Sequence, residues 1–386
     1  MQITSRTEFG LLAQTFNKTG LGAEIGVERG NFSKLILNGY KGNLISVDMW
    51  ASEPIYKEAL ITLKETISNG RSRIGRMSSL EAAEEISDEA LDFVYIDADH
   101  DYAAAKADLE AWFPKVRHGG LVAGHDYLNW TKDQGAGCDF GVKAAVDEFC
   151  VKHGYKLNVT TDNFWEGNPY PTWYFTKEIP RIIYYTWVNP DPLPERFQKY
   201  IDGWKVLMPD YQVKEICLAN ITRSPFVEEA IRRGKYSVAG HYGRCQRLYE
   251  TGGIYFDIDV EAVRRFDDIL DVQFFVGCET DTRVNNAVIG SKPEHEFIKM
   301  ALDFMDAFDF DNPGKFGIEI ETGPEMFTSI AKYYGWQEKD LFQWLANIGA
   351  AVFDSSVFYP YYFDEKYYPG CVNMTTYAVH HWAKTW

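Results

Sequence analysis

Short apolar segments alternate with longer amphipathic segments between residues 22 and 175. The short segments fit buried strands, and the longer ones carry apolar residues at helical spacing. This order of elements predicts an α/β fold with a parallel, doubly wound sheet. The expected strands span 23–27, 43–48, 73–76, 91–97, 120–125 and 172–175, and the expected helices span 31–38, 54–68, 102–112 and 142–153.

A second α/β pattern begins after a polar, proline-containing stretch at residues 161–171 and the strand that follows it. A fresh apolar strand, Ile-Pro-Arg-Ile-Ile-Tyr-Tyr-Thr-Trp, occupies residues 179–187. At 386 residues the chain is long for one hydrophobic core, so we expect two domains. We place the boundary near Lys177, which gives domains at 1–177 and 178–386.

The most specific pattern in the second half is a strand that ends in two carboxylates. A helix expected at 238–250 is followed by two glycines and an apolar segment that leads into Asp257 and Asp259. Alternate side chains of a strand share a face, so these two acids should point the same way. Phe256 and Ile258, which alternate with these acids along the strand, should then point into the core.

Two like charges at the end of a buried strand repel, and a cation between them would relieve that repulsion. Oxygen ligands suit Mg²⁺ or Mn²⁺. Such a cation would hold a diphosphate, as a nucleotide-sugar transferase requires. The alternative is an ordinary solvated strand end, because Asp-X-Asp is a common sequence.

A glycine-containing loop connects the first strand of the chain to its first helix. The loop is Glu24-Ile-Gly26-Val-Glu-Arg-Gly30, and the next strand ends in Asp48. Glycines let a backbone approach a ligand closely, and the following helix N-terminus favours anionic groups. An acid at Asp48 suits the two hydroxyls of a ribose. The pattern fits enzymes that bind NAD, flavin or S-adenosylmethionine (SAM), and the Glu-X-Gly-X-X-X-Gly spacing favours SAM.

Two further segments of the first half carry a resemblance to a known family. They are Asp-Phe-Val-Tyr-Ile-Asp-Ala-Asp-His-Asp-Tyr at 92–102 and Gly-Gly-Leu-Val-Ala-Gly-His-Asp-Tyr at 119–127. With the glycine loop, they resemble the class I SAM-dependent methyltransferases, and within these the metal-dependent sugar O-methyltransferases. The resemblance implies a Rossmann-like fold. The residues implied for SAM are Glu24, Gly26, Gly30, Asp48 and Asp97.

The same resemblance implies the groups that perform methyl transfer. Asp97 and Asp126 take the positions of acids that hold Mg²⁺, and His100 has the spacing of the general base. A bound metal lowers the pKa of a sugar hydroxyl, and an imidazole can take its proton. The sequence departs from the family beside the second acid, where His125 and Tyr127 replace the usual acid or amide.

The second half resembles a different family. The run from residue 239 to residue 259 is similar to the DXD sugar-binding region of family 32 glycosyltransferases. That family includes Och1-type mannosyltransferases and, more distantly, the large clostridial toxin glucosyltransferases. The strand at 179–187, the segment Trp-Lys-Val-Leu-Met-Pro-Asp-Tyr at 204–211 and the pair Asn285-Asn286 also resemble family landmarks. The resemblance implies a GT-A fold and retaining, metal-dependent transfer.

The family pattern assigns roles to individual residues. Asp257 and Asp259 would hold the metal, with His381 as a further ligand from the C-terminus and His380 as the alternative. Arg244 and Asp259 would be catalytic. His241 stands where the family has an aspartate that binds the donor sugar, which puts the identity of that sugar in doubt. The residues implied for the nucleotide sugar are Trp187, His241, Arg244, Asp257, Asn286 and the terminal Trp386.

Composition limits the classes of binding partner that the protein is expected to have. The formal net charge of −17 disfavours nucleic acid, which requires a basic face. No apolar run approaches the roughly 20 residues of a membrane span, and the N-terminus lacks a signal pattern. The six cysteines show no paired spacing, as expected of free thiols in the cytoplasm.

Taken together, the motifs predict a bifunctional enzyme of glycan biosynthesis. One domain would O-methylate a sugar hydroxyl with SAM. The other would transfer a sugar from a UDP- or GDP-sugar, with Mn²⁺ or Mg²⁺, to a glycan, lipid-linked sugar or glycosylated metabolite. Two alternatives remain: that only one domain is catalytic and the other is a docking or structural module, and that the transferase modifies proteins.

Overall fold

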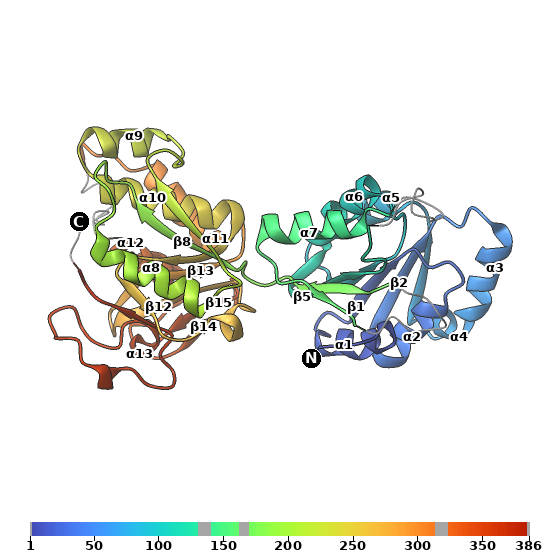
Figure 1. Cartoon of the computed structure of the whole chain (residues 1–386). Helices are drawn as coiled ribbons and strands as arrows, with labels where there is room; N and C mark the ends of the chain where they lie inside the picture. Colours follow the sequence, from blue (N-terminus) through green and yellow to red (C-terminus); the bar gives the residue numbers. More distant parts are fainter. Residues whose placement is uncertain (1, 130–139, 162–169, 313–322, 384–386) are drawn as a thin grey trace. The chain divides into compact units, whose positions relative to one another are not determined.

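The computed structural model describes residues 2–129, 140–161, 170–312 and 323–383. Its contacts divide the chain into two compact units, Met1–Lys177 and Glu178–Trp386. Each unit is built around one seven-stranded mixed sheet with helices on both faces (Figure 1). Among the described residues, no helix combines the length and the apolar character needed to span a bilayer.

The N-terminal sheet has the strand order β3-β2-β1-β4-β5-β7-β6. The first five strands in this order are parallel, as expected, whereas β7 runs antiparallel to β5 and pairs with a short antiparallel β6. The apolar pattern of a four-residue strand does not indicate whether the strand runs parallel or antiparallel to its neighbour. The strands are β1 (Leu21–Ile25), β2 (Asn43–Asp48), β3 (Ser72–Arg76), β4 (Leu91–Ile96), β5 (Val116–Gly124), β6 (Asn158–Val159) and β7 (Trp173–Thr176).

Helices cover both faces of this sheet, because side chains alternate along each strand. On β4, Val94 and Ile96 pack with α5, α6 and α7, whereas Phe93 and Tyr95 pack with α1 and α2. The single helix expected at 54–68 is divided in two at Leu63. The helices are α1 (Phe9–Thr15), α2 (Asn31–Gly39), α3 (Glu53–Thr62), α4 (Lys64–Ser68), α5 (Ser79–Glu84), α6 (Tyr102–Trp112) and α7 (Val142–His153).

The register of the parallel strands aligns their carboxyl ends. Ile25 on β1 pairs with Val47 on β2 and with Ile96 on β4, and Ile96 pairs with Gly124 on β5. The residues that follow each strand therefore gather at one edge of the sheet, which is where ligands bind in open α/β sheets.

The C-terminal sheet has the order β14-β15-β12-β13-β10-β8-β9. The strand β10 is parallel to β8 and antiparallel to β13. The next strand along the chain, β11, forms a separate antiparallel pair with β16 near the C-terminus. The strands are β8 (Ile182–Trp187), β9 (Gln212–Cys217), β10 (Gly253–Phe256), β11 (Val260–Ala262), β12 (Phe274–Thr280), β13 (Arg283–Ser291), β14 (Gln343–Leu345), β15 (Ala350–Phe353) and β16 (Ala378–His380).

Two apolar clusters enclose the C-terminal sheet. One face packs against α9, α10, α11 and α12, and the other packs against α8 and α13. On β10, Tyr255 faces the first cluster, while Ile254 and Phe256 face the second. The helices are α8 (Glu195–Leu207), α9 (Pro225–Arg232), α10 (Tyr236–Thr251), α11 (Glu296–Asp306), α12 (Pro324–Tyr333) and α13 (Ser355–Phe358).

Candidate active sites

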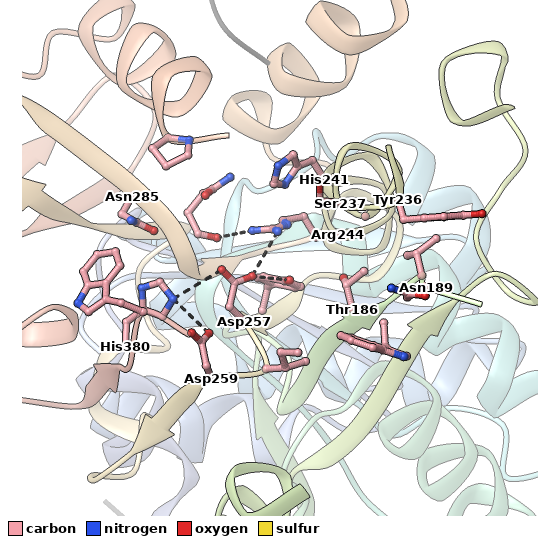
Figure 2. Close-up of a pocket in the computed structure, with 18 of the residues that line it drawn as sticks. Thr186, Asn189, Tyr236, Ser237, His241, Arg244, Asp257, Asp259, Asn285 and His380 are labelled. Atoms are coloured by element: carbon pink, nitrogen blue, oxygen red, sulfur yellow. Dashed lines mark hydrogen bonds and ion pairs between the residues drawn. The ribbon is translucent and has the colours of Figure 1, made fainter. Parts of the chain in front are cut away.

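A cavity of about 450 Å³ opens in the C-terminal unit, beside the end of β10 (Figure 2). Its walls come from the end of β8, one side of α10, the residues after β10, and β12, β13 and β16. A volume of this order is typical of ligand-binding pockets. The predicted donor-site residues Trp187, His241, Arg244, Asp257 and Asn286 all line it. Trp386 lies outside the described residues.

The two acids of the DXD motif face this cavity from a turn. The strand β10 ends at Phe256, and the N–H of Val260 donates to the carbonyl of Asp257 at 3.0 Å, which closes the turn before β11. Phe256 packs in the core, as expected. Ile258 is also buried, as expected, and it borders the cavity as well. The chain leaves the strand one residue earlier than the apolar pattern indicates.

One oxygen of each aspartate is anchored, and the other faces His380. Asp257 Oδ1 accepts from the Tyr255 hydroxyl at 2.7 Å, and its Oδ2 lies 4.0 Å from His380 Nε2. Asp259 Oδ2 accepts from the N–H of Ala383 at 2.6 Å, and its Oδ1 lies 3.1 Å from the same nitrogen. Two carboxylates and one imidazole thus converge, with one ligand atom of each within 4.8 Å of the others.

His380, and not His381, is the histidine beside these acids. The strand β16 pairs with β11 in antiparallel register, and neighbouring side chains of a strand point to opposite faces. The ring of His381 therefore turns away, and its Nε2 lies 2.8 Å from Glu261 Oε2. The structure corrects the sequence-based preference for His381 as the ligand at the DXD motif.

The surroundings of His380 suit a cation-binding ligand. The side chain is buried, and among the described residues neither ring nitrogen makes a hydrogen bond of acceptable geometry. Burial opposes the charged imidazolium, yet the nearby Asp259 and Asp257 raise the pKa of His380 above its ordinary value. A buried imidazole without a good hydrogen bond, facing two carboxylates, fits a divalent cation with oxygen and nitrogen ligands.

Arg244 links the acids to β13. Its guanidinium lies 3.2 Å from Asp257 Oδ1 and donates to the backbone carbonyl of Asn286 at 2.8 Å. It also lies over the ring of Tyr255, with 4.2 Å from Cζ to the ring centroid. The side-chain amide nitrogen of Asn286 is buried and has no hydrogen-bond partner among the described residues. An unpartnered buried donor in a cavity wall is costly, so it indicates a bound acceptor group.

Sequence reasoning missed an acid that lines the cavity from β12. Glu279 on β12 is buried, lines the cavity and accepts from Asn285 Nδ2 at 2.9 Å. It supplies a carboxylate that α10 lacks, because the helix carries His241 at the family's aspartate position. No local signal marks Glu279, since only the pairing of β12 with β13 brings it to the cavity.

In the N-terminal unit, the glycine loop is shaped by contacts within the protein. Gly26 has φ +86°, and a Cβ there would lie 1.9 Å from the carbonyl oxygen of Asp97. Gly30 is the N-cap residue that precedes α2, and its φ is +77°. Glu24 is buried and accepts from the Ser33 hydroxyl, and burial raises its pKa to about 8. Glycine is therefore needed at position 26 to let β1 and β4 approach.

Asp48 holds the same loop from the end of β2. Its Oδ2 accepts from the N–H groups of Val27 and Glu28, each at 2.9 Å, and its Oδ1 accepts from the N–H of Trp50 at 2.7 Å. Each carboxylate oxygen has two lone pairs, so these three bonds leave one acceptor position, on Oδ1, for a ribose hydroxyl. The sequence analysis predicted that Asp48 contacts a ligand, but it did not predict that Asp48 also holds the backbone of the glycine loop.

The ends of β4 and β5 bring together the residues predicted for methyl transfer. His100 Nε2 lies 2.8 Å from Asp126 Oδ2, and its ring stacks on Phe140 with centroids 4.9 Å apart. The hydrogen bond to Asp126 raises the pKa of His100, against an opposing effect of burial. Burial favours the neutral acid, yet the two histidines hold the pKa of Asp126 well below its usual range. Asp126 also has φ +56°, a strained conformation typical of functional sites.

Arg6 reaches this cluster from the N-terminal segment, which the sequence analysis left unassigned. Its guanidinium lies 2.5 Å from Asp97 Oδ2 and over the ring of Phe32 at 3.9 Å. The residue belongs to a short 3-10 helix, Arg6–Glu8, with a capping box between Ser5 and Glu8. Because 91 residues separate Arg6 from Asp97, no sequence pattern could have linked them.

Protein families match one segment in each half of the chain. A family model described as a methyltransferase domain matches residues 23–127. A second, described as a glycosyltransferase sugar-binding region containing a DXD motif, matches residues 194–275. The first match contains the glycine loop and Asp126, and the second contains Arg244 and both DXD acids.

Two curated relatives come from yeasts. Mannosyl phosphorylinositol ceramide synthase CSH1 of Saccharomyces cerevisiae is 32% identical over 134 residues, covering 31% of this chain and 33% of that protein. Inositol phosphoceramide mannosyltransferase 3 of Schizosaccharomyces pombe is 24% identical over 220 residues, covering 53% of this chain and 60% of that protein. The matched regions thus span between a third and three fifths of these relatives.

Solved structures similar to parts of the chain include representatives of both classes. An O-methyltransferase from Bacillus cereus in complex with SAH has 19% identity and a TM-score of 0.36, covering 46% of this chain and 82% of that one. The PaToxG glycosyltransferase has 19% identity and a TM-score of 0.35, covering 40% of this chain and 70% of that one.

The chain contains a methyltransferase domain in its N-terminal half and a DXD-containing sugar-binding region in its C-terminal half. The N-terminal sheet has the Rossmann-like methyltransferase fold expected from the sequence, and the C-terminal half is a glycosyltransferase domain.

Proposed function

We propose that this protein is a bifunctional transferase that builds a methylated glycan or glycoconjugate. The C-terminal unit transfers a hexosyl group from a UDP- or GDP-sugar with retention of configuration, and the N-terminal unit O-methylates a sugar hydroxyl with SAM. The observation that carries the proposal is the convergence of Asp257, Asp259 and His380 in the wall of the 450 Å³ cavity. The methyltransferase model over residues 23–127 supports the second activity.

Asp257, Asp259 and His380 would hold Mn²⁺ or Mg²⁺. The chemistry that a divalent ion would supply there is neutralisation of the charge that develops on the departing diphosphate. Arg244 keeps Asp257 in place and adds a positive charge to the same wall of the cavity. Asn286 supplies the unpartnered amide donor for a phosphate or sugar oxygen.

Sugar transfer breaks the bond between the anomeric carbon and the diphosphate and forms a bond to the acceptor oxygen. The proton of the acceptor hydroxyl leaves to the departing diphosphate. Trp187, at the end of β8, lines the cavity, and its proposed role is to stack on the nucleotide base. The yeast relatives are named for mannosyl transfer to inositol phosphoceramide, so a mannosyl donor and a glycolipid acceptor are the first pair to test.

Methyl transfer would use His100 as the general base. The imidazole takes the proton of the sugar hydroxyl as the methyl–sulfur bond of SAM breaks and the oxygen–methyl bond forms. Asp126, at 2.8 Å, orients the ring and stabilises the imidazolium. The products are the methyl ether and S-adenosylhomocysteine (SAH).

The assignment of His380 as a metal ligand predicts different outcomes for two adjacent histidines. His380→Ala removes one of three converging ligands and is expected to weaken Mn²⁺ binding by about 100-fold. His381→Ala removes a partner of Glu261 and is expected to leave Mn²⁺ affinity unchanged. Electron paramagnetic resonance titration of Mn²⁺ measures both constants. Equal losses in the two variants would contradict the assignment.

The direct test of the proposed function is donor hydrolysis and donor binding by the full chain. UDP-, GDP- and dTDP-sugars, with GDP-mannose first, are titrated with and without Mn²⁺, and SAH is titrated in parallel. Metal-dependent binding of one donor together with SAH binding is the expected result. Binding of SAH without any donor would leave a methyltransferase with a docking module, and the reverse result would leave a transferase with a structural domain.

A further inference from the structure

A third carboxylate lies in the wall of the C-terminal cavity, besides the two acids of the DXD motif. Glu279, near the end of β12, lines the cavity with its side chain only 5% exposed. A buried charge is costly unless hydrogen bonds or opposite charges compensate for it. The contacts of its two oxygens therefore show whether Glu279 is a purely structural group or one that is open to a ligand.

Only one of these oxygens makes a hydrogen bond within the described part of the chain. Glu279 Oε2 accepts from Asn285 Nδ2 at 2.9 Å. Its Oε1 lies 3.8 Å from the guanidinium of Arg283, beyond hydrogen-bond distance, and that guanidinium also lies 3.4 Å from Glu325. A carboxylate accepts about four hydrogen bonds, so most of the acceptor capacity of Glu279 is unused.

The contact with Asn285 fixes the orientation of both side chains. Asn285 Oδ1 accepts from the N–H of Ala287 at 2.8 Å, so the amide nitrogen is the end that faces Glu279. The two residues lie on paired strands, β12 and β13. Side chains that are held on strands by hydrogen bonds are in position before a ligand arrives, which is a property of good binding sites.

Glu279 lies near the cluster that is proposed to hold the metal. Burial lowers the pKa of His380, and nearby carboxylates, Glu279 among them, raise it. Figure 2 shows Asn285, the partner of Glu279, at the His380 end of the site, whereas Asn189 lies at the other end. Trp187, proposed for the nucleotide base, is two residues before Asn189 in the chain. A diphosphate at the cluster would therefore have its base on that side and its sugar on the side of Glu279.

The polar groups at this end of the cavity suit hydroxyl groups. Glu279 offers acceptors only, and the buried Nδ2 of Asn286, the residue after Asn285, offers a donor that has no partner among the described residues. A hydroxyl both donates and accepts, so the hydroxyls of a hexose can satisfy both groups. Hydrogen bonds to a charged carboxylate are also stronger than those between neutral groups.

We infer that Glu279 binds hydroxyl groups of the hexose in the nucleotide-sugar donor, and that it thereby distinguishes the complete donor from its nucleotide. The inference rests on the proposed sugar transfer. It narrows the donor to a neutral sugar with free hydroxyls, because a sugar that carries its own carboxylate would be repelled by Glu279.

Isothermal titration of the full chain with Mn²⁺ present tests the inference. GDP-mannose is compared with GDP, and UDP-glucose with UDP. In Glu279→Gln, the side-chain oxygen is expected to stay on Asn285, which leaves an amide donor facing the cavity in place of an acceptor. We expect the Kd of the nucleotide sugar to rise by about 10–100-fold and that of its nucleoside diphosphate to stay unchanged. Equal changes in both constants, or no change in either, would overturn the inference.

A control variant and a second set of ligands strengthen this test. Glu296→Gln removes the same charge from an exposed position on α11 and should leave both constants unchanged. Monodeoxy analogues of the bound donor are titrated into the unmodified chain and into Glu279→Gln. At least one analogue should bind the unmodified chain more weakly than the donor does, and this difference should vanish in Glu279→Gln, where the same hydrogen bond is already absent.

Failure of the proposed function and failure of this inference give different results. An unmodified chain that binds neither donor with Mn²⁺ would contradict the proposed function and this inference with it. A chain that binds one donor, with the same affinity in a folded Glu279→Gln variant, would contradict the role of Glu279 alone. Unchanged donor affinity with a raised KM for the acceptor would assign Glu279 to the acceptor and also overturn the inference.

Discussion

Asparagine at position 259 is expected to abolish metal-dependent binding of the sugar donor. Asp259 is buried, with one oxygen held by the backbone of Ala383 and the other 3.1 Å from His380. The substitution keeps the size of the side chain and its acceptor for Ala383, but it removes the charge that a divalent ion requires. We expect donor hydrolysis to fall by about 10²–10³-fold, the range seen when one electrostatic contact to a transition state is lost.

The matched control for this variant is Asp271→Asn, which removes the same charge from an exposed position in the same unit. Isothermal titration with the donor and Mn²⁺ should give the unmodified affinity in the control and no metal-dependent heat in Asp259→Asn. Donor binding that is equally strong in both variants would mean that the DXD acids do not hold the ion. A melting temperature measured for each variant separates this result from unfolding.

Alanine at position 26 is expected to abolish SAH binding while leaving donor binding intact. The residue has φ +86°, and the added Cβ would lie 1.9 Å from the carbonyl oxygen and 2.5 Å from the carbonyl carbon of Asp97. These are backbone atoms, so β1 and β4 must separate at the edge where the cofactor would bind. Strained backbone and overpacking each cost about 1–3 kcal/mol. We therefore expect SAH affinity to fall by at least about 30-fold.

Gly20→Ala isolates the steric part of this effect. Gly20 also has a positive φ, +75°, but nothing lies within 4 Å of a Cβ built there. It therefore carries the backbone strain without the collision. Titration with SAH should give near-normal affinity for Gly20→Ala and no detectable binding for Gly26→Ala. If the two variants lose affinity equally, the close approach of β1 to Asp97 is not what the cofactor site requires.

Several elements follow from local patterns alone. The helices at 102–112 and 142–153 and the strand at 43–48 have the predicted bounds. In each case a run of apolar residues with a clear period is bounded by a residue that favours an end. Asp101, for example, accepts from the N–H of Ala104 and so starts α6. Such signals involve neighbours in the chain and are therefore present in the sequence.

The sequence predicted some features of the candidate sites and not others. Acids that follow apolar strands were correctly expected at the cavity and at the edge of the first sheet, because parallel strands end together. Ile258 is buried as expected but lies in the turn after β10, because the exact residue at which a strand becomes a turn depends on its neighbours in space. The long helix expected at 54–68 was divided at Leu63, which is fully buried.

The sequence by itself determined the two-part α/β organisation, the chemical types at each site and the likeness to two transferase families. Tertiary structure alone decided which nitrogen meets which carboxylate. A shift of one residue in β16 exchanges His380 for His381, and Arg6 meets Asp97 across 91 residues. Spacing along the chain specifies which face a side chain occupies only relative to its own element. The contacts between elements arise from packing, and packing therefore decided that Asp257 and Asp259 converge on His380 and that Asp97 meets Arg6.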